Sequence, residues 1–292
     1  MQHSRTAMAW LLAIVLVAIA AYRPGLHGGF LFDDFVNLPA LGSTGAVDNW
    51  PTFWRYITSG TADPTGRPLT LLTFLLDAQN WPANPYPFKR TSLILHLING
   101  VLLYGLLAKL GALLNVETPR YRTAALFGAA MWLLHPLLVS TTLYVVQREA
   151  MLPATCVLIG LQLWLHGRTQ WAASRRLAGL IWSLAGLGGF GLLGILAKGN
   201  GALLPIYALL IEFVLLTSRQ PFGDGVTQRA YRAFQYIFIF LPAIAICSYL
   251  SWTGVHGVLV GGPALRPWTY GQRMLTEPRV LVDYLALLWL PR

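Results

Sequence analysis

The run AMAWLLAIVLVAIAAY, residues 7–22, is the first of a series of apolar segments that decide the fold. Further segments follow at about 91–108, 123–145, 150–166, 177–197, 202–217 and 233–251, and an eighth begins near Val280. A helix needs about 20 mainly apolar residues to cross a bilayer. The sequence therefore predicts an all-α polytopic membrane protein with about seven to eight transmembrane helices.

The composition supports this class and excludes others. Hydrophobic residues make up 55% of the 292 residues and charged residues only 11%, which an ordinary soluble domain does not show. The net charge of +10 is spread over short connections and forms no dense basic stripe, so we expect no nucleic-acid partner. Cys156 and Cys247 lie in apolar runs, which excludes a disulfide framework or a CxxC zinc motif.

The first apolar run has a second interpretation. Arg5 precedes it and Ala18-Ile19-Ala20 lies near its end, a pattern that a cleavable signal peptide also shows. The many later spans favour a retained helix. Both interpretations bring Asp33 and Asp34 to the non-cytoplasmic side of the membrane.

Charge in the connections predicts the orientation. With the N-terminus in the cytoplasm, the inner connections receive most of the loop arginines, as the positive-inside rule requires. These are Arg120, Arg122, Arg168, Arg175, Arg176, Arg219, Arg229 and Arg232. The outer side then holds two longer segments, 23–90 and 252–279.

We expect one integral-membrane module over residues 1–292, with 23–90 as its large outer loop. Within this loop, 49–57 and 69–76 show the mixture of aromatic, apolar and polar residues typical of short interfacial helices. The proline-rich stretch 80–87 is predicted to be irregular. The last apolar run stops after about ten residues, too few to cross a bilayer, so the chain looks truncated.

Two adjacent carboxylates stand out in FLFDDFVNL, residues 30–38. Like charges this close repel, which raises the pKa of one of them unless a donor or cation compensates, and such a group is a candidate general base. Asp33 and Asp34 could equally belong to a solvated loop or cap a following helix.

Further polar side chains are expected at the same membrane face. They are Arg67, His96 with Asn99 one turn later, His135 before Pro136, Gln147-Arg148-Glu149, and Lys198. Cations here could bind the anionic group of a lipid-linked phosphate and stabilise a leaving phosphate. Structural alternatives exist for each.

Those alternatives are specific. Arg148 and Lys198 could be snorkelling anchors. His96 and Asn99 could hydrogen-bond between helices, and His135 could bond backbone groups freed by the Pro136 kink. Glu212 is interpreted as structural, and glycines in 186–194 as sites of close helix packing.

No His or Cys pair has metal-ligand spacing, so no metal site is predicted. One alternative to the absence of a metal site is that Asp33 and Asp34 hold a divalent ion together with a substrate phosphate.

The ordered motifs resemble the GT-C class of polytopic glycosyltransferases, most of all the branch of protein O-mannosyltransferases, transmembrane-and-TPR O-mannosyltransferases and bacterial type IV pilin glycosyltransferases. The resemblance rests on short motifs that cover nearly the whole chain. They are Phe32-Asp33-Asp34, Arg67-Pro68-Leu69, LILHLIN (93–99), His135-Pro136, Gln147-Arg148-Glu149, AKGNGALLP (197–205) and LTEPRVLVDYLALLWLP (275–291).

The resemblance implies sugar transfer from a polyprenyl-phosphate donor to a hydroxyl of a pilin-like protein or a glycolipid, at the periplasmic face of a bacterial inner membrane. It implies that Asp33 or Asp34 is the base and that Arg148 and Lys198 lie near the donor phosphate. Arg67, His96, His135 and Gln147 complete the expected substrate site. One departure is that the family commonly has Lys-Glu where this chain has Lys198-Gly199, so we expect Lys198 to lack its acidic partner.

Two other functions remain open at this stage. A transporter or flippase of lipid-linked substrates would also need charges within the membrane, and a non-catalytic scaffold would need no reactive site.

Overall fold

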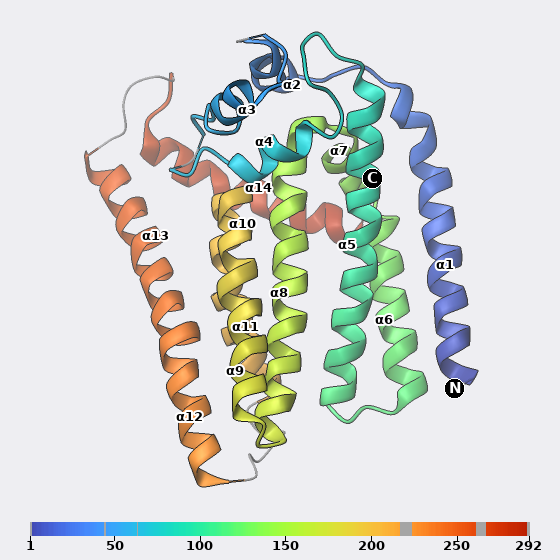
Figure 1. The fold of residues 1–292 in the computed structure, drawn as a ribbon, viewed down its shortest axis with the longest axis vertical. Coiled ribbons are helices and arrows are strands. Elements are labelled where there is room, and N and C mark those ends of the chain that lie inside the picture. The colour runs from blue at the N-terminus through green and yellow to red at the C-terminus, as the bar shows by residue number, and fades with distance from the viewer. Residues whose placement is uncertain (1, 44, 63, 217–223, 261–266, 291–292) are drawn as a thin grey trace.

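The computed structural model describes residues 2–43, 45–62, 64–216, 224–260 and 267–290, and these residues form helices and no β-strand. Long helices lie side by side, and short helices cover one end of them (Figure 1). Six helical segments are long and apolar enough to cross a membrane, and a seventh is obtained if one bent pair counts as a single span. The predicted all-α fold of membrane-spanning helices is thereby confirmed.

The long segments are built from regular helices joined by tighter or wider turns. Their α-helices are α1 (Gln2–Tyr22), α5 (Pro85–Leu113), α6 (Thr118–Leu133), α8 (Arg148–Ala172), α9 (Arg176–Leu184), α10 (Gly191–Ala197), α11 (Leu204–Leu210), α12 (Gly225–Gln235) and α13 (Leu241–Val260). Their other turns are η1 (Arg23–His27), η4 (Ala185–Phe190), η5 (Gly199–Leu203), η6 (Ile211–Leu216) and η7 (Tyr236–Phe240).

The short elements at the covered end come mostly from the predicted outer loop. They are α2 (Asp34–Asn37), η2 (Leu38–Gly42), α3 (Trp50–Ile57), α4 (Pro68–Phe74), α7 (Leu137–Leu143) and η3 (Val145–Gln147). The two short helices expected in this loop are confirmed as α3 and α4. Asn49 caps α3 with its side chain, and Pro51 lies in the first turn, where no backbone donor is needed.

Several predicted boundaries need correction. The span predicted at 91–108 is a 29-residue helix that begins at Pro85, because prolines are tolerated in a first helical turn. The stretch 80–87 is therefore irregular only up to Asn84. The span predicted at 123–145 is broken near His135-Pro136, where α6 and α7 meet at a bend of 64°.

The eighth span predicted near Val280 is wrong among the described residues. That sequence belongs to α14 (Tyr270–Trp289), which is not among the helices apolar enough to span, and its first half carries Arg273, Glu277 and Arg279. In Figure 1, α14 runs across the direction of the long helices.

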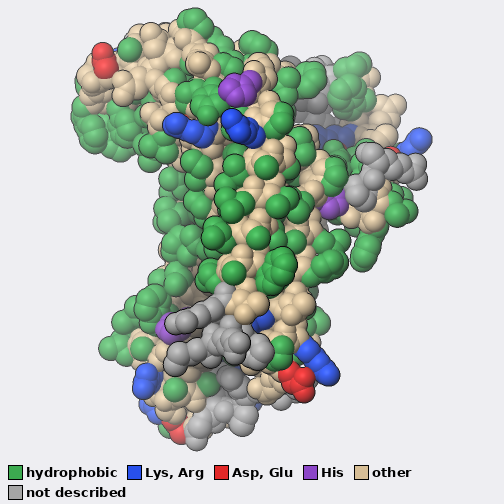
Figure 2. All heavy atoms as spheres, turned by 90° about the vertical axis from the view of Figure 1, so that its right-hand side faces the viewer, with side chains coloured by type: hydrophobic (Ala, Val, Ile, Leu, Met, Phe, Trp, Pro, Cys, Tyr) green, Lys and Arg blue, Asp and Glu red, His purple; other side chains and the backbone are tan. Residues whose placement is uncertain are grey.

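The connections separate into two ends as the predicted topology requires. The N-terminus and the α5–α6 and α8–α9 connections lie at one end, and the outer-loop elements lie at the other (Figure 1). On the face shown in Figure 2, charged side chains gather towards both ends and hydrophobic side chains cover the middle. Arg219 lies outside the described residues.

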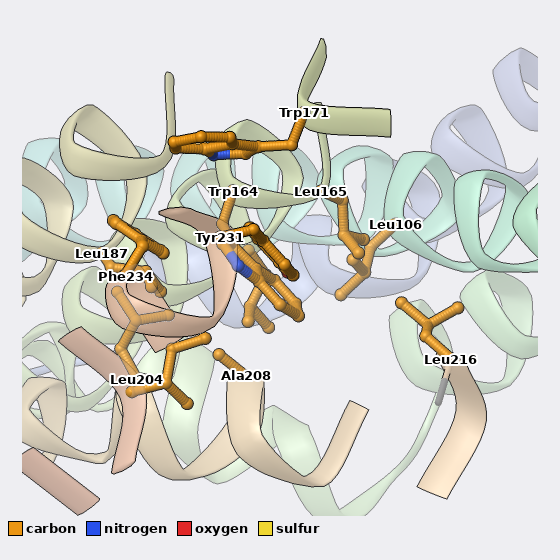
Figure 3. Close-up of a cluster of buried hydrophobic side chains, with 12 residues drawn as sticks. Leu106, Trp164, Leu165, Trp171, Leu187, Leu204, Ala208, Leu216, Tyr231 and Phe234 are labelled. Carbon is orange, nitrogen blue, oxygen red and sulfur yellow. The ribbon is translucent and has the colours of Figure 1, made fainter. Parts of the chain in front are cut away.

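Arg168 is a buried exception among the arginines predicted for the inner connections. Its guanidinium pairs with Glu212 at 2.8 Å, and Glu212 also accepts a hydrogen bond from Tyr231, so the structural interpretation of Glu212 is confirmed. Next to this network, aromatic and aliphatic side chains of α8, α11 and α12 form the largest buried cluster, which Figure 3 shows converging between the helices.

Glycine permits the closest helix contact, as predicted for 186–194. A Cβ atom added to Gly186 would lie 2.5 Å from the Gly160 carbonyl oxygen, whereas one added to Gly189 would meet nothing within 4 Å. In a membrane, where lipid tails are as apolar as side chains, such close backbone packing is a main source of helix association.

We predict that Gly186→Ala lowers the thermal unfolding temperature of the purified protein, because α8 and the 176–197 segment must move apart. Gly189→Ala is the matched control in the same run and is expected to leave that temperature unchanged or raise it slightly, since alanine favours helix. Equal losses in both variants would contradict close packing at Gly186.

Candidate functional site

Asp34 is a buried carboxylate that holds the outer loop to η3. Its Oδ2 accepts a hydrogen bond from the Leu31 amide at 2.9 Å, and its Oδ1 accepts one from the Val146 amide at 2.8 Å. The side chain is fully buried, and burial raises the pKa of Asp34 although the two amides and the charge of Lys89 oppose this. Asp34 is therefore built into the scaffold of the site.

Asp33 is exposed beside it. Its backbone amide donates a hydrogen bond to the Tyr144 hydroxyl at 2.8 Å, and its carbonyl accepts one from the Asn37 side chain at 2.8 Å. Phe32 precedes it with a φ of 36°, an uncommon value for a residue with a side chain. Neighbouring groups thus fix the backbone of Asp33, and its exposed side chain interacts with the Tyr144 hydroxyl.

Burial raises the pKa of Tyr144, and the charges of Asp33 and Asp34 act in the same direction. The Tyr144 hydroxyl consequently stays protonated beside the two carboxylates at neutral pH.

Lys89 is a buried neighbour of Asp34 that no motif in the sequence indicates. It lies in the first turns of α5, is 3% exposed, and lies near enough for its charge to lower the pKa of Asp34. Lys89 sits next to Arg90 at the edge of an apolar run, so it reads as an ordinary membrane-edge cation. Lysine side chains are rarely buried, and the burial of Lys89 is visible only in the folded structure.

A second cluster joins three of the outer-face residues. The Glu149 carboxylate forms an ion pair with Arg67 through Oε2 and with Lys198 through Oε1, the latter at 2.9 Å. Exposure of these side chains is between 15% and 23%. The expectation that Lys198 lacks an acidic partner is therefore wrong: Glu149, 49 positions earlier, supplies it.

The backbone around this cluster is unusual. Arg67 has φ 57° and ψ 45°, a left-handed conformation that is disfavoured for a side chain, and it precedes proline, which further disfavours it. Gly60 and Gly66 pack backbone against backbone in the same loop, so neither has room for a Cβ atom. Strain of this kind concentrates at functional sites.

Lys198 is positioned by the end of α10. It is extended, with φ −168°, and its amide bonds the Gly194 carbonyl. The Thr70 hydroxyl of α4 donates to the Ala197 carbonyl at 2.9 Å, which ties the Arg67 segment to the Lys198 segment. Gly201 packs directly on Gly194, which explains the second glycine of AKGNG.

One cavity connects the two clusters. It has a volume of about 150 Å³ and is lined by α2 and its neighbours, by the 59–67 loop, by α4, and by the 146–149 segment. Asn37, which bonds Asp33, and Val146, which bonds Asp34, line it together with Arg67 and Glu149. Of the predicted site residues Asp33, Arg67 and Lys198, only Arg67 lines this cavity among the described residues. Asp33 and Lys198 instead contact the lining residues Asn37 and Glu149.

Arg148 lies behind the cavity wall. It is fully buried and pairs with Asp77 at 2.6 Å, and its other donors bond the Thr73 and Phe88 carbonyls and the Ser92 hydroxyl. The Phe74 ring, which lines the cavity, covers its guanidinium at 4.9 Å. With these partners, Arg148 holds α4, α5 and α8 together, and a substrate phosphate would have to break this network to reach it.

The two histidines make interhelical bonds. His96 stacks on Trp132 and its Nε2 contacts the Leu133 carbonyl at 3.0 Å, while Asn99 donates to the Met151 carbonyl at 3.0 Å. This confirms the predicted bonds of His96 and Asn99 between helices.

The His135 side chain joins the α7 side of the kink to α14. Its Nδ1 accepts from the Leu137 amide at 3.2 Å, and its Nε2 contacts the Leu288 carbonyl of α14 at 3.1 Å. Neither His96 nor His135 lines the cavity.

The Gln147 side chain makes no hydrogen bond to another described residue. Among the described residues, no group of three His, Cys, Asp or Glu side chains could hold a metal ion.

We predict that the two aspartates differ in their effect on stability. Asp34→Asn leaves one side-chain oxygen for two buried amides and should cost about 1–3 kcal/mol, seen as a lower unfolding temperature. Asp33→Asn changes an exposed carboxylate and should stay within about 0.5 kcal/mol of the parent. A larger loss for Asp33→Asn would refute the assignment of Asp34 to the scaffold.

Comparisons with known proteins add no assignment. No protein-family model, no curated protein and no solved structure matches the chain.

Proposed function

We propose that the protein is a membrane glycosyltransferase that moves a sugar from a polyprenyl-phosphate donor to a hydroxyl acceptor. The observation that carries this proposal is the convergence of the Arg67 guanidinium and the Lys198 ammonium on one carboxylate at the cavity. Two cations that meet on the oxygens of Glu149 have the geometry of an oxyanion site.

A phosphate presents the same kind of oxygens as a carboxylate and carries more charge. In this proposal the donor phosphate takes the place of Glu149 at Arg67 and Lys198. The donor's polyprenyl chain remains in the bilayer beside the outer ends of the helices, and its sugar enters the cavity.

Asp33 is the base in this proposal. It is exposed, whereas both carboxylate oxygens of Asp34 are occupied by backbone amides. This difference supports Asp33 over Asp34 as the base, and in this proposal Asp34, with Lys89 nearby, is a positioning residue.

The reaction breaks the bond between the anomeric carbon and a phosphate oxygen and forms a bond between that carbon and the acceptor oxygen. Asp33 takes the hydroxyl proton, and the polyprenyl phosphate leaves with the electron pair. Arg67 and Lys198 stabilise the charge that grows on the leaving phosphate, which is the main electrostatic contribution expected at such a site.

The acceptor is a protein, pilin-like in the resemblance, or a glycolipid. The resemblance implies a bacterial inner membrane. The arginines near the opposite end support an orientation with the N-terminus in the cytoplasm and the cavity in the periplasm.

A transporter is less well supported by the positions of the charges. Substrate sites of transporters lie near the bilayer midplane. The two buried ion pairs of α8, at Arg148 and Arg168, lie near the two ends of that 25-residue helix instead.

Replacing the base tests the reaction. Asp33→Asn should reduce sugar transfer by about 10²-fold or more, because general-base catalysis contributes 10²–10⁴. The measurement is mass spectrometry of pilins and lipids from cells that lack the gene or carry the parent or variant chain. Asp48→Asn, another exposed outer-loop aspartate, is the control. Full sugar addition by Asp33→Asn would exclude the mechanism, and the same loss in both variants would point to an effect on the loop.

Replacing the competing carboxylate tests the donor site. Glu149→Gln removes the negative charge from Arg67 and Lys198, so binding of polyprenyl phosphate to protein in nanodiscs should tighten by at least about fivefold, since even ~1 kcal/mol of charge interaction has this effect. Lys198→Gln should weaken it. Glu117→Gln, at an exposed pair with Arg120, is the control. Unchanged binding in both cavity variants would place the phosphate elsewhere.

A further inference from the structure

A separate apolar groove lies between α1 and α6, at the end of the bundle away from Asp33. Thr6, Ala7, Trp10 and Ile14 line it from α1, and Pro119, Arg122, Thr123, Leu126, Phe127 and Ala130 line it from α6. Its volume is about 430 Å³. We propose that this groove binds an anionic glycerophospholipid, with one acyl chain between the helices and the phosphate at Arg122.

The spacing of the lining residues gives the groove a direction. On each helix they lie one, three or four positions apart, the spacing of residues that share one helix face, so they form one stripe along that face. From Pro119 to Ala130 the stripe extends about 16 Å at 1.5 Å per residue. One leaflet of the hydrocarbon core is about 15 Å thick, so an acyl chain of one leaflet fits the length of the groove.

Arg122 supplies the charge at one end of this stripe. It is half-buried and is the one ionisable residue among the described residues that line the groove. Among the described residues it forms no ion pair, and its guanidinium carbon lies 6.0 Å from the Tyr121 ring centre. Arg120, two positions earlier, is exposed and pairs with Glu117 at 3.2 Å.

The headgroup decides which lipid is preferred. An acyl chain is in an apolar environment both in the groove and in the bilayer, so the chain itself gives little selectivity. A phosphate headgroup with a net negative charge gains the interaction with Arg122, whereas a choline headgroup carries its own cation. One basic residue then favours the anionic lipid by roughly fivefold, equivalent to about 1 kcal/mol.

Fluorescence quenching of Trp10 tests the proposal. The full chain is placed in phosphatidylcholine nanodiscs containing increasing fractions of phosphatidylglycerol with brominated acyl chains, or of brominated phosphatidylcholine. The chain has 11 tryptophans, so the Trp10 signal is the difference between the parent and Trp10→Phe. We expect brominated phosphatidylglycerol to reach half-maximal quenching of Trp10 at a roughly fivefold lower fraction than brominated phosphatidylcholine.

Matched variants separate the groove from general surface charge. Arg122→Gln should abolish the headgroup preference, and Arg120→Gln, with the same change in net charge, should retain it. Ala130→Phe fills the groove and should reduce quenching by both lipids, whereas Ala124→Phe, exposed on the same helix, should not. Equal quenching by the two lipids in the parent, or equal effects of the two arginine variants, would overturn the proposal.

Discussion

The contact of one carboxylate with two cations organises the outer end of the molecule. Glu149 belongs to the first turn of α8, Arg67 precedes α4, and Lys198 follows α10, so this contact joins three segments that are distant in sequence. The cavity lies against it, and the segment that carries Glu149 also provides the Val146 amide for Asp34. A change at Glu149 would therefore reach both sides of the cavity.

Neighbouring residues at this end divide into two kinds. The side chains of Asp34 and Arg148 are fully buried, and their polar atoms are engaged by protein partners, so they stabilise the arrangement. Asp33 and Lys198, adjacent to other parts of the same framework, are partly or fully accessible. In the proposed reaction this buried layer would hold Asp33 and Lys198 in place, so that the reacting groups need little reorganisation.

The sequence predicts the fold well because apolar length alone determines a membrane span, as residues 7–22 and 177–197 illustrate. It fails at α14, where charged residues in the first half of the helix prevent a span. The sequence also correctly predicts hydrogen bonds between helices for His96 and Asn99, since polar groups inside a bundle need partners.

The site itself is predicted only in part. The predicted topology places three residues at the same end of the helices: Asp33, Arg67 and Lys198. The ion-pair partners do not follow from topology, because the pairing of Glu149 with Lys198, and of Arg148 with Asp77, depends on how α4, α8 and α10 pack. The adjacent residues Arg148 and Glu149 bind different partners, and no pattern in the chain distinguishes the buried arginine from the glutamate beside the cavity.

The most direct test is an experimental structure of the protein in a lipid nanodisc with polyprenyl phosphate bound. The quantity to measure is the distance from the phosphate oxygens to the Arg67 guanidinium and the Lys198 ammonium. We predict that both lie within about 3 Å, the range of charge-assisted hydrogen bonds, with the Glu149 carboxylate displaced. A phosphate bound elsewhere, with Glu149 still joining Arg67 and Lys198, would contradict the account.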